Sequence, residues 1–291
     1  MLPDPVAAWR AGGRMLDTPA GRVFVRDAPG RDPAAPTILL LHGFPSSSYD
    51  YRGVVAELGD RAWVTLDFLG FGLSDKPRPH RYSLFEQADI VERVVAETTA
   101  GPVLLIAHDM GTSVATELLA RDLDGALPFE LRAAVLTNGS VILDRASLRP
   151  AQKLLRSPLG PVFARLTNER RFARGFGRLF GPAHPLSADE AAAQWALLAH
   201  HDGHRIGHLL IHYLRERVEF APRWHGAVRD WPKPLSFLWA LADPVATGDV
   251  LAGLRALRPH AAVAELPGIG HYPQLEVPAE FTRAALGLLA A

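Results

Sequence analysis

One aspartate, Asp109, stands where a run of branched apolar residues gives way to a helix-forming sequence. The run is Val103-Leu-Leu-Ile-Ala107, the next residues are His108-Asp-Met-Gly111, and a helical pattern begins at about Thr112. A strand that ends in a tight turn before a helix is typical of a nucleophile elbow, which presents one side chain at the top of a sheet. Serine is usual there, and a carboxylate instead favours attack on a saturated carbon.

Two other interpretations of this segment compete. Gly111-Thr-Ser-Val-Ala115 fits a looser pattern that would make Ser113 the nucleophile of an esterase. The register favours Asp109, because the apolar run ends at Ala107 and leaves Ser113 in the first helical turn. The plainer alternative makes Asp109 an ordinary helix N-cap.

Two later residues complete a triad in the chain order nucleophile, acid, histidine. Asp243 follows the apolar run Leu235–Ala240, and His271 follows a second run that ends at Leu266. Both therefore lie just past strand ends, at the same edge of a parallel sheet. The plainer interpretations are a turn former before Pro244 for Asp243, and a polar loop residue for His271.

The sequence His42-Gly-Phe-Pro45 follows the first buried strand and predicts an oxyanion hole. A sharp turn there would direct the backbone N–H of Phe44 at the reacting carboxylate, and the N–H of Met110 would be the second donor. Loss of one such donor typically costs ~10²–10³ in rate.

The remaining patterns describe the elements that must position these residues. Strands are expected at 22–26, 37–41, 63–67, 103–107, 131–137, 234–240 and 261–266, and helices at 51–58, 83–98, 112–121 and 280–289. Ser83 and Glu86 form a capping-box sequence at the start of the second helix. Alternating strands and helices indicate an α/β fold, a mostly parallel sheet with helices on both faces.

Between residues 141 and 232 the strand pattern disappears, and Arg, Ala, Leu and Pro predominate. This predicts an all-helical lid, inserted after the sixth sheet strand and lying over the strand ends where ligands bind. The predicted division is a core of residues 1–140 and 233–291 and a lid of 141–232.

Composition narrows the class of protein. The 291 residues include no cysteine, which excludes disulfides and thiolate zinc sites, and 31 basic residues balance 31 acidic ones. No global field would attract nucleic acid or a membrane. The N-terminus is a poor signal peptide, and no apolar run approaches the ~18 residues of a membrane span. We expect a cytoplasmic, bacterial protein, a monomer or small homo-oligomer, with a small-molecule substrate and no cofactor.

Together these residues resemble the α/β-hydrolase superfamily in its aspartate-nucleophile branch, which includes epoxide hydrolases and haloalkane dehalogenases. The segments Asp67–His80, Tyr82–Gln87, Asn138-Gly139 and His271–Glu276 resemble hydrolases related to the mesoderm-specific transcript protein. The likeness runs from about residue 36 to the end. It implies the α/β-hydrolase fold, with a mostly parallel eight-stranded sheet.

Departures from the better-understood relatives bear on the substrate. Haloalkane dehalogenases usually hold the halide with a tryptophan after the nucleophile and an asparagine after His-Gly, where this chain has Met110 and Phe44. Possible substitutes as substrate or leaving-group contacts are Asn138, Trp195 and Trp224. Fluoroacetate dehalogenases carry arginines near the nucleophile, and residues 110–120 contain none. Epoxide hydrolases use lid tyrosines, usually two, and this lid has only Tyr213.

The resemblance and the residues together imply an epoxide hydrolase-like enzyme acting on a small apolar substrate, with haloalkane dehalogenase as the alternative. Asp109 would form an alkyl-enzyme ester, which water activated by His271 would hydrolyse. A non-catalytic ligand-binding protein on the same fold is the alternative from another class.

Two further patterns have plainer interpretations. His204, His208 and His212 recur every four residues, a spacing that would place three potential metal ligands on one helical face. No carboxylate joins them at helical spacing, so we expect a partly solvated lid face and no metal. The segment 67–75 has the composition of a structural loop.

Overall fold

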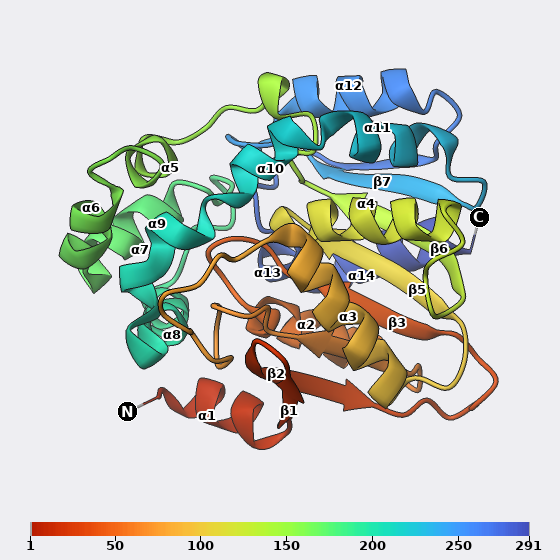
Figure 1. Ribbon diagram of the computed structural model, residues 1–291, viewed down its shortest axis with the longest axis horizontal. Helices are drawn as coiled ribbons and strands as arrows, with labels where there is room; N and C mark the ends of the chain where they lie inside the picture. The colour runs from red at the N-terminus through yellow and green to blue at the C-terminus, as the bar shows by residue number, and fades with distance from the viewer. Residues whose placement is uncertain (1, 291) are drawn as a thin grey trace.

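The computed structural model describes residues 2–290 and contains one eight-stranded sheet (Figure 1). The order across the sheet is β1-β2-β4-β3-β5-β6-β7-β8. The strands are β1 Arg14–Thr18, β2 Gly21–Ala28, β3 Thr37–Leu41, β4 Trp63–Leu66, β5 Val103–His108, β6 Leu131–Thr137, β7 Leu235–Ala240 and β8 Val263–Leu266. The predicted mostly parallel, eight-stranded sheet is confirmed, since only β1 and β2 pair antiparallel with their neighbours.

The strand that the sequence patterns missed is β1 at the sheet edge. It forms a hairpin with β2, and of its five residues only Leu16 is buried. An edge strand with one buried side chain has too little apolar alternation to be recognised from sequence.

Helices cover both faces of the central strands, which explains why those strands are apolar at most positions. On β3, Ile38 and Leu40 pack into the layer that contains α2 (Arg52–Glu57) and α14 (Pro278–Leu289). The alternate residue Leu39 faces the opposite layer. That layer contains α3 Leu84–Thr98, α4 Met110–Leu123, α11 Ala221–Asp230 and α12 Gly248–Leu257.

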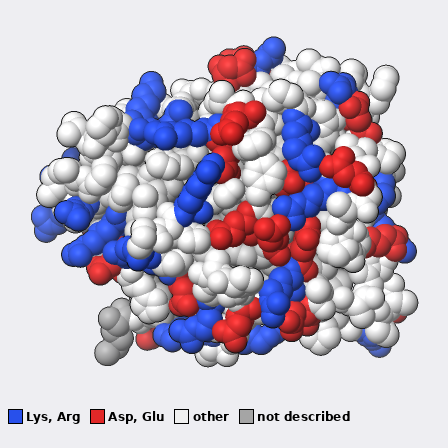
Figure 2. Space-filling view, in the orientation of Figure 1, with Lys and Arg blue, Asp and Glu red and all other residues white. Residues whose placement is uncertain are grey.

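The chain between β6 and β7 is helical, as predicted, and its first part projects from the sheet as a cap (Figure 1). The cap elements are η2 Leu143–Arg145, α5 Pro150–Leu155, α6 Gly160–Leu166, α7 Glu169–Gly177, α8 Ala188–Ala199, η3 His200–Ile206, α9 Gly207–Leu210 and α10 Tyr213–Glu219. Lys and Arg predominate over acidic residues at this end of the molecule (Figure 2).

The last helix of the predicted lid, α11, belongs to the core layer by its packing. It lies against α4 and α12, and its Trp224, Ala227 and Val228 are part of the main core. The predicted lid boundary at residue 232 therefore includes a helix that covers the sheet rather than the site.

The remaining helices lie outside these layers. They are α1 Asp4–Ala11, η1 Ser48–Tyr51 and α13 Pro273–Glu276. None of the helices within residues 2–290 has the length and apolar composition needed to cross a bilayer.

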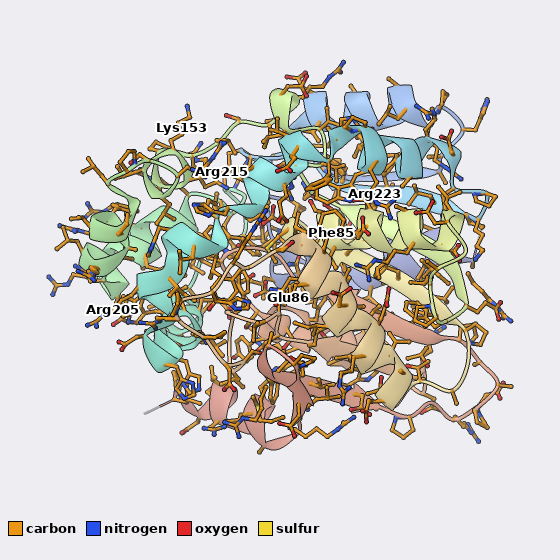
Figure 3. The ribbon with its side chains drawn as sticks, in the orientation of Figure 1. Phe85, Glu86, Lys153, Arg205, Arg215 and Arg223 are labelled. Atoms are coloured by element: carbon orange, nitrogen blue, oxygen red, sulfur yellow. The ribbon has the colours of Figure 1, made fainter. Side chains whose placement is uncertain are left out.

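Of the two contacts in the capping box predicted for α3, one is present and one is not. Ser83 is the N-cap, and its side chain accepts a hydrogen bond from Phe85 N. Glu86, which Figure 3 marks at the start of this helix, does not complete the box, because its carboxylate pairs with His80 at 2.7 Å. His80 from the preceding loop thus takes the place of the Ser83 backbone N–H as the partner of Glu86.

Candidate active site

Asp109 occupies a strained turn between β5 and α4. Its backbone has φ 45° and ψ −111°, and α4 begins at the next residue. Such angles cost a residue other than glycine about 1–3 kcal/mol and persist where the surrounding structure enforces them. The Asp109 side chain makes no capping hydrogen bond to α4, so the carboxylate is not used as an ordinary N-cap.

The two carboxylate oxygens of Asp109 have different surroundings. Oδ2 accepts a hydrogen bond from the backbone N–H of Phe44 at 2.9 Å. Oδ1 is buried and accepts none from residues 2–290. The approach of the Phe44 loop requires Gly43, because a Cβ there would lie 2.6 Å from Asp109 Cβ. Phe44 N–H thus lies where the predicted oxyanion hole needs it, and Met110 begins α4 beside it, where backbone N–H groups lack intrahelical partners.

Asp243 and His271 lie together beyond β7 and β8. His271 Nδ1 is 2.7 Å from Asp243 Oδ2, and both side chains are almost fully buried. The other carboxylate oxygen, Asp243 Oδ1, accepts the N–H of Val245 at 2.7 Å. The histidine ring is therefore fixed through Nδ1, which leaves Nε2 for chemistry.

The electrostatics of this pair favour charge on both partners. Burial lowers the pKa of His271, but the charge and hydrogen bond of Asp243, together with the charge of Asp109, outweigh it and raise the pKa to about 9. Burial raises the pKa of Asp243, yet His271, Val245 N–H and Asn138 hold it below its ordinary value. His271 is thus protonated at neutral pH.

Asn138 does not face the cavity as a leaving-group contact, which corrects that expectation. Its side-chain amide donates to Asp243 Oδ2 at 2.8 Å and to Ala240 O at 3.1 Å. Its Oδ1 accepts from Ala240 N at 2.9 Å. Both donors are used, so Asn138 holds the triad acid.

Two polar residues that the sequence analysis did not single out support His271. His108 Nε2–H donates to the carbonyl of His271 at 2.7 Å, and His108 Nδ1 accepts from Gln274 Nε2 at 3.1 Å. Burial, followed by the charge of His271, lowers the pKa of His108 to about 4, so this ring is neutral. Its position directly before the nucleophile was the one available sequence signal.

A buried arginine also approaches Asp109, from α10 of the cap. Arg217 Nη2 lies 3.9 Å from Asp109 Oδ1 and donates to the Asp109 carbonyl at 3.0 Å. Its Nε donates to Ser113 Oγ at 2.7 Å. Ser113 is thus buried inside α4 and engaged by a cation, which disfavours it as a nucleophile. Residues 110–120 contain no arginine, so the sequence near Asp109 did not reveal this contact. The arginine comes from a helix that is distant in the sequence.

Tyr213 reaches the same place from the start of α10. Its ring centroid lies 5.9 Å from that of Phe44, and the Arg217 guanidinium lies 4.6 Å from the Tyr213 ring. The hydroxyl is buried and has no hydrogen-bond partner within residues 2–290. Burial, followed by the charge of Asp109, raises the pKa of Tyr213, so the phenol keeps its proton.

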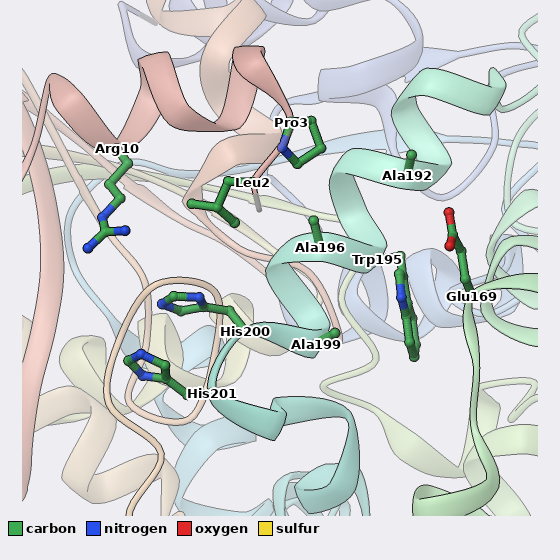
Figure 4. A pocket seen from close by; sticks show the side chains of 10 residues that line it. All are labelled: Leu2, Pro3, Arg10, Glu169, Ala192, Trp195, Ala196, Ala199, His200 and His201. Atoms are coloured by element: carbon green, nitrogen blue, oxygen red, sulfur yellow. The ribbon is translucent and has the colours of Figure 1, made fainter.

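The two lid tryptophans lie elsewhere, contrary to the expectation that they could contact a leaving group. Trp224 is fully buried in the core, and its N–H donates to Glu117 at 2.9 Å. Trp195 lines a different, open hollow of about 680 Å³ between α1 and α8 (Figure 4). Neither tryptophan ring lines the cavity that contains His271.

A cavity of about 240 Å³ lies over the site, under the cap. Phe44 and His271 form part of its wall, and most of the other lining residues are apolar; those from α5, α6 and α7 include Leu155, Phe163 and Phe176. Three arginines, Arg149, Arg171 and Arg178, also line it. The cavity suits a small apolar molecule.

The three histidines of the lid lie on different elements, and not on one helical face. His204 lies in η3, His208 in α9, and His212 precedes α10, so they share no single helix. No cluster of three potential metal-ligating side chains occurs in the described part of the chain.

The loop after β4 is structural. Asp67 accepts hydrogen bonds from the backbone N–H groups of Ser48 and Leu73, and its carbonyl accepts from Ser74 Oγ. These contacts fix the turn beneath the cap.

Comparison with known proteins places this geometry in a family. The model described as alpha/beta hydrolase fold matches residues 36–278. The chain therefore belongs to the alpha/beta hydrolase fold family, which confirms the predicted fold.

Particular relatives are also similar over nearly their whole lengths. LipZ of Mycobacterium tuberculosis is 68% identical over 289 residues, 99% of either chain. The mesoderm-specific transcript homolog protein of Homo sapiens is 36% identical, covering 99% of this chain and 89% of that protein. The crystal structure of haloalkane dehalogenase DbeA from Bradyrhizobium elkani aligns with a TM-score of 0.79 at 24% identity, covering 96% and 97% of the two chains. The predicted resemblance to the mesoderm-specific transcript group is confirmed.

Proposed function

We propose that this hydrolase opens epoxides of small apolar compounds through a covalent ester on Asp109. The observation that carries the proposal is the unequal environment of its carboxylate. Oδ2 is held by Phe44 N–H, whereas Oδ1 is buried without a donor. A buried carboxylate oxygen without hydrogen bonds is the more reactive nucleophile, because no donor stabilises its charge.

In the first step, Oδ1 attacks a ring carbon and the carbon–oxygen bond of the epoxide breaks. The electron pair of that bond goes to the epoxide oxygen, which takes the proton of Tyr213. The buried, unpartnered hydroxyl of Tyr213 supports this role. The ester carbonyl is then formed by Oδ2, next to Phe44 N–H.

In the second step, neutral His271 takes a proton from water through Nε2, and the hydroxide attacks Cγ of Asp109. The oxyanion that develops on Oδ2 is stabilised by the N–H groups of Phe44 and Met110. The bond between Cγ and Oδ1 breaks, and the departing diol oxygen takes the proton from His271. The product keeps Oδ1, and the oxygen of water replaces it in Asp109. The proton that this oxygen carries passes from the Asp109 carboxyl to the Tyr213 phenolate, which restores both groups.

Trapping the ester tests the scheme. His271→Phe should still be alkylated but should not release product, because no base activates water. Intact-protein mass spectrometry should show protein plus substrate, such as a terminal alkyl epoxide, located on the peptide containing Asp109. Asp109→Ala is the control and should form no adduct.

Isotope labelling gives an independent check. In a single turnover in ¹⁸O-water, the label should enter Asp109 and not the diol. A fully active His271→Phe variant, or a diol labelled in the first turnover, would contradict the scheme.

Tyr213→Phe separates epoxide opening from dehalogenation. Loss of the proton donor should lower kcat for diol formation by about 10²–10⁴, the usual contribution of general acid catalysis, with KM little changed. A departing halide needs no proton, so halide release from alkyl bromides should not respond to this variant. If wild type releases halide but forms no diol, the haloalkane alternative is correct.

A further inference from the structure

The outer face of the cap carries a cluster of exposed apolar side chains on and beside α6. Leu159, Val162 and Leu166 are 62%, 55% and 59% exposed. They account for three of the seven large apolar side chains that are exposed within residues 2–290. Spacings of three and four residues place them on one side of the helix. A cluster of this kind, unlike single exposed residues, usually marks an interaction site.

The inner side of α6 explains why this outer side is free. Gly160 and Ala164 are buried against the rest of the cap, and Phe163 lines the cavity above His271. The helix therefore borders the cavity through Phe163 and exposes the apolar cluster to the outside.

The segment that carries the cluster is rich in cations, of which Arg149, Arg171 and Arg178 also border the cavity. Residues 149–178 contain eight Lys and Arg and one acidic residue, Glu169. None of these eight takes part in an ion pair within the described residues, in contrast to paired arginines such as Arg121. Lys153 projects outward from α5 (Figure 3), and blue and white dominate this end of the molecule in Figure 2.

We propose that this face of the cap docks on an anionic phospholipid surface. Leu159, Val162 and Leu166 would enter the boundary between headgroups and acyl chains, and the arginines of this segment would pair with lipid phosphates. A second copy of the chain fits poorly, because an isologous contact would bring the basic patch against itself. Docking would also place the cavity wall next to a reservoir of apolar molecules. This binding does not depend on the proposed chemistry.

Vesicle co-sedimentation tests the proposal. Wild type should bind vesicles of mixed phosphatidylglycerol and phosphatidylcholine, bind pure phosphatidylcholine weakly, and dissociate at high salt. The triple variant Leu159→Ser, Val162→Ser, Leu166→Ser should lower the partition coefficient by at least about tenfold. The charge reversals Arg165→Glu and Arg170→Glu should each lower it by fivefold or more, since each basic residue near an anionic surface contributes about that factor.

The control is Val218→Ser on α10. Val218 is also 62% exposed, but it lies outside the basic segment, between Arg217 and Glu219. Its binding should equal that of wild type, and unchanged thermal unfolding should show that all the variants fold.

Three outcomes would overturn the proposal. The first is no binding to anionic vesicles, or equal binding to neutral ones. The second is conversion of a dimer to a monomer by the triple variant in light scattering, which would assign the cluster to a second copy. The third is retention on soluble polyglutamate as strong as on vesicles, with no loss in the triple variant, which would indicate charge alone.

Discussion

At the scale of single residues, the charge on Asp109 adds to the larger effect of Asp243 in favouring a protonated His271. Asp109 is one of the groups that raise the pKa of His271 to about 9. Conversion of Asp109 to a neutral ester removes that contribution, so the pKa of His271 must fall. In the proposed reaction, His271 would therefore lose its proton more readily once Asp109 is esterified, which favours the proposed order of the two steps.

This coupling predicts the pH dependence of the second step. Decay of the ester should accelerate as pH rises and level off below pH 9, because His271 in the alkylated enzyme loses its proton more readily than in the free enzyme. Single-turnover stopped-flow measurements at a series of pH values would record this. A plateau reached only above pH 9, or a rate that falls with rising pH, would contradict the coupling.

At the scale of elements, the site depends on how closely α4 approaches the end of β3. A Cβ on Gly111 would lie 2.6 Å from the carbonyl oxygens of Leu41 and His42. Both contacts are with backbone, which cannot move aside as a flexible side chain can. The elbow and the loop of the oxyanion hole are thereby locked together.

We expect Gly111→Ala to destabilise the protein by about 2 kcal/mol or more, within the range for overpacking. The matched control is Gly287→Ala in α14, where nothing lies within 4 Å of the added methyl. That change should stabilise by about 0.5–1 kcal/mol through helix propensity. Urea unfolding measures both, and equal effects would show that the close contact has no energetic consequence.

The α3 capping box shows why element ends are less predictable than elements. Ser83 caps the helix as its sequence predicts, because the acceptor and donor lie two residues apart. Glu86 instead binds His80, whose position depends on the preceding loop. The partner of a long side chain such as that of Glu86 depends on which groups the folded chain brings near it.

At the scale of the whole molecule, buried neutral histidines make folding sensitive to acid. His42 Nδ1–H donates to Gly43 O, and its Nε2 accepts the N–H of Phe68, so a second proton has no acceptor. Burial lowers the pKa of His42 to about 3 and that of His108 to about 4. Unfolded histidines have a pKa of about 6.5, so the unfolded chain binds more protons below that pH.

Stability should therefore fall as pH decreases from about 6.5 towards 4, by about 1.4 kcal/mol per pH unit for each of these two histidines. Asp50 opposes the trend, because burial raises its pKa to about 7 and its folded form binds the proton more tightly. Asp50→Asn should consequently steepen the loss. Unfolding midpoints of both proteins across this pH range give the test, and a stability that rises on acidification would refute it.

The whole-chain charge balance describes the molecule poorly at this scale. Equal numbers of basic and acidic residues predict no attraction to an anionic surface. Folding separates the charges, because acidic groups such as Glu117 are buried among their own arginines, whereas the eight cations of residues 149–178 have no such partners within the described residues. Charge at a surface depends on which side chains share a face, and composition does not record this.

The sequence by itself determined the parallel sheet, the helical insertion and the order of Asp109, Asp243 and His271. These features are local: a strand pattern, a turn and a spacing carry them. Tertiary structure alone decided that Asn138 holds Asp243, that Trp224 turns to Glu117, and that Arg217 reaches Asp109 from a helix more than a hundred residues away. The physical reason is that a buried polar group must find a partner, and the nearest partner in space is seldom the nearest in sequence.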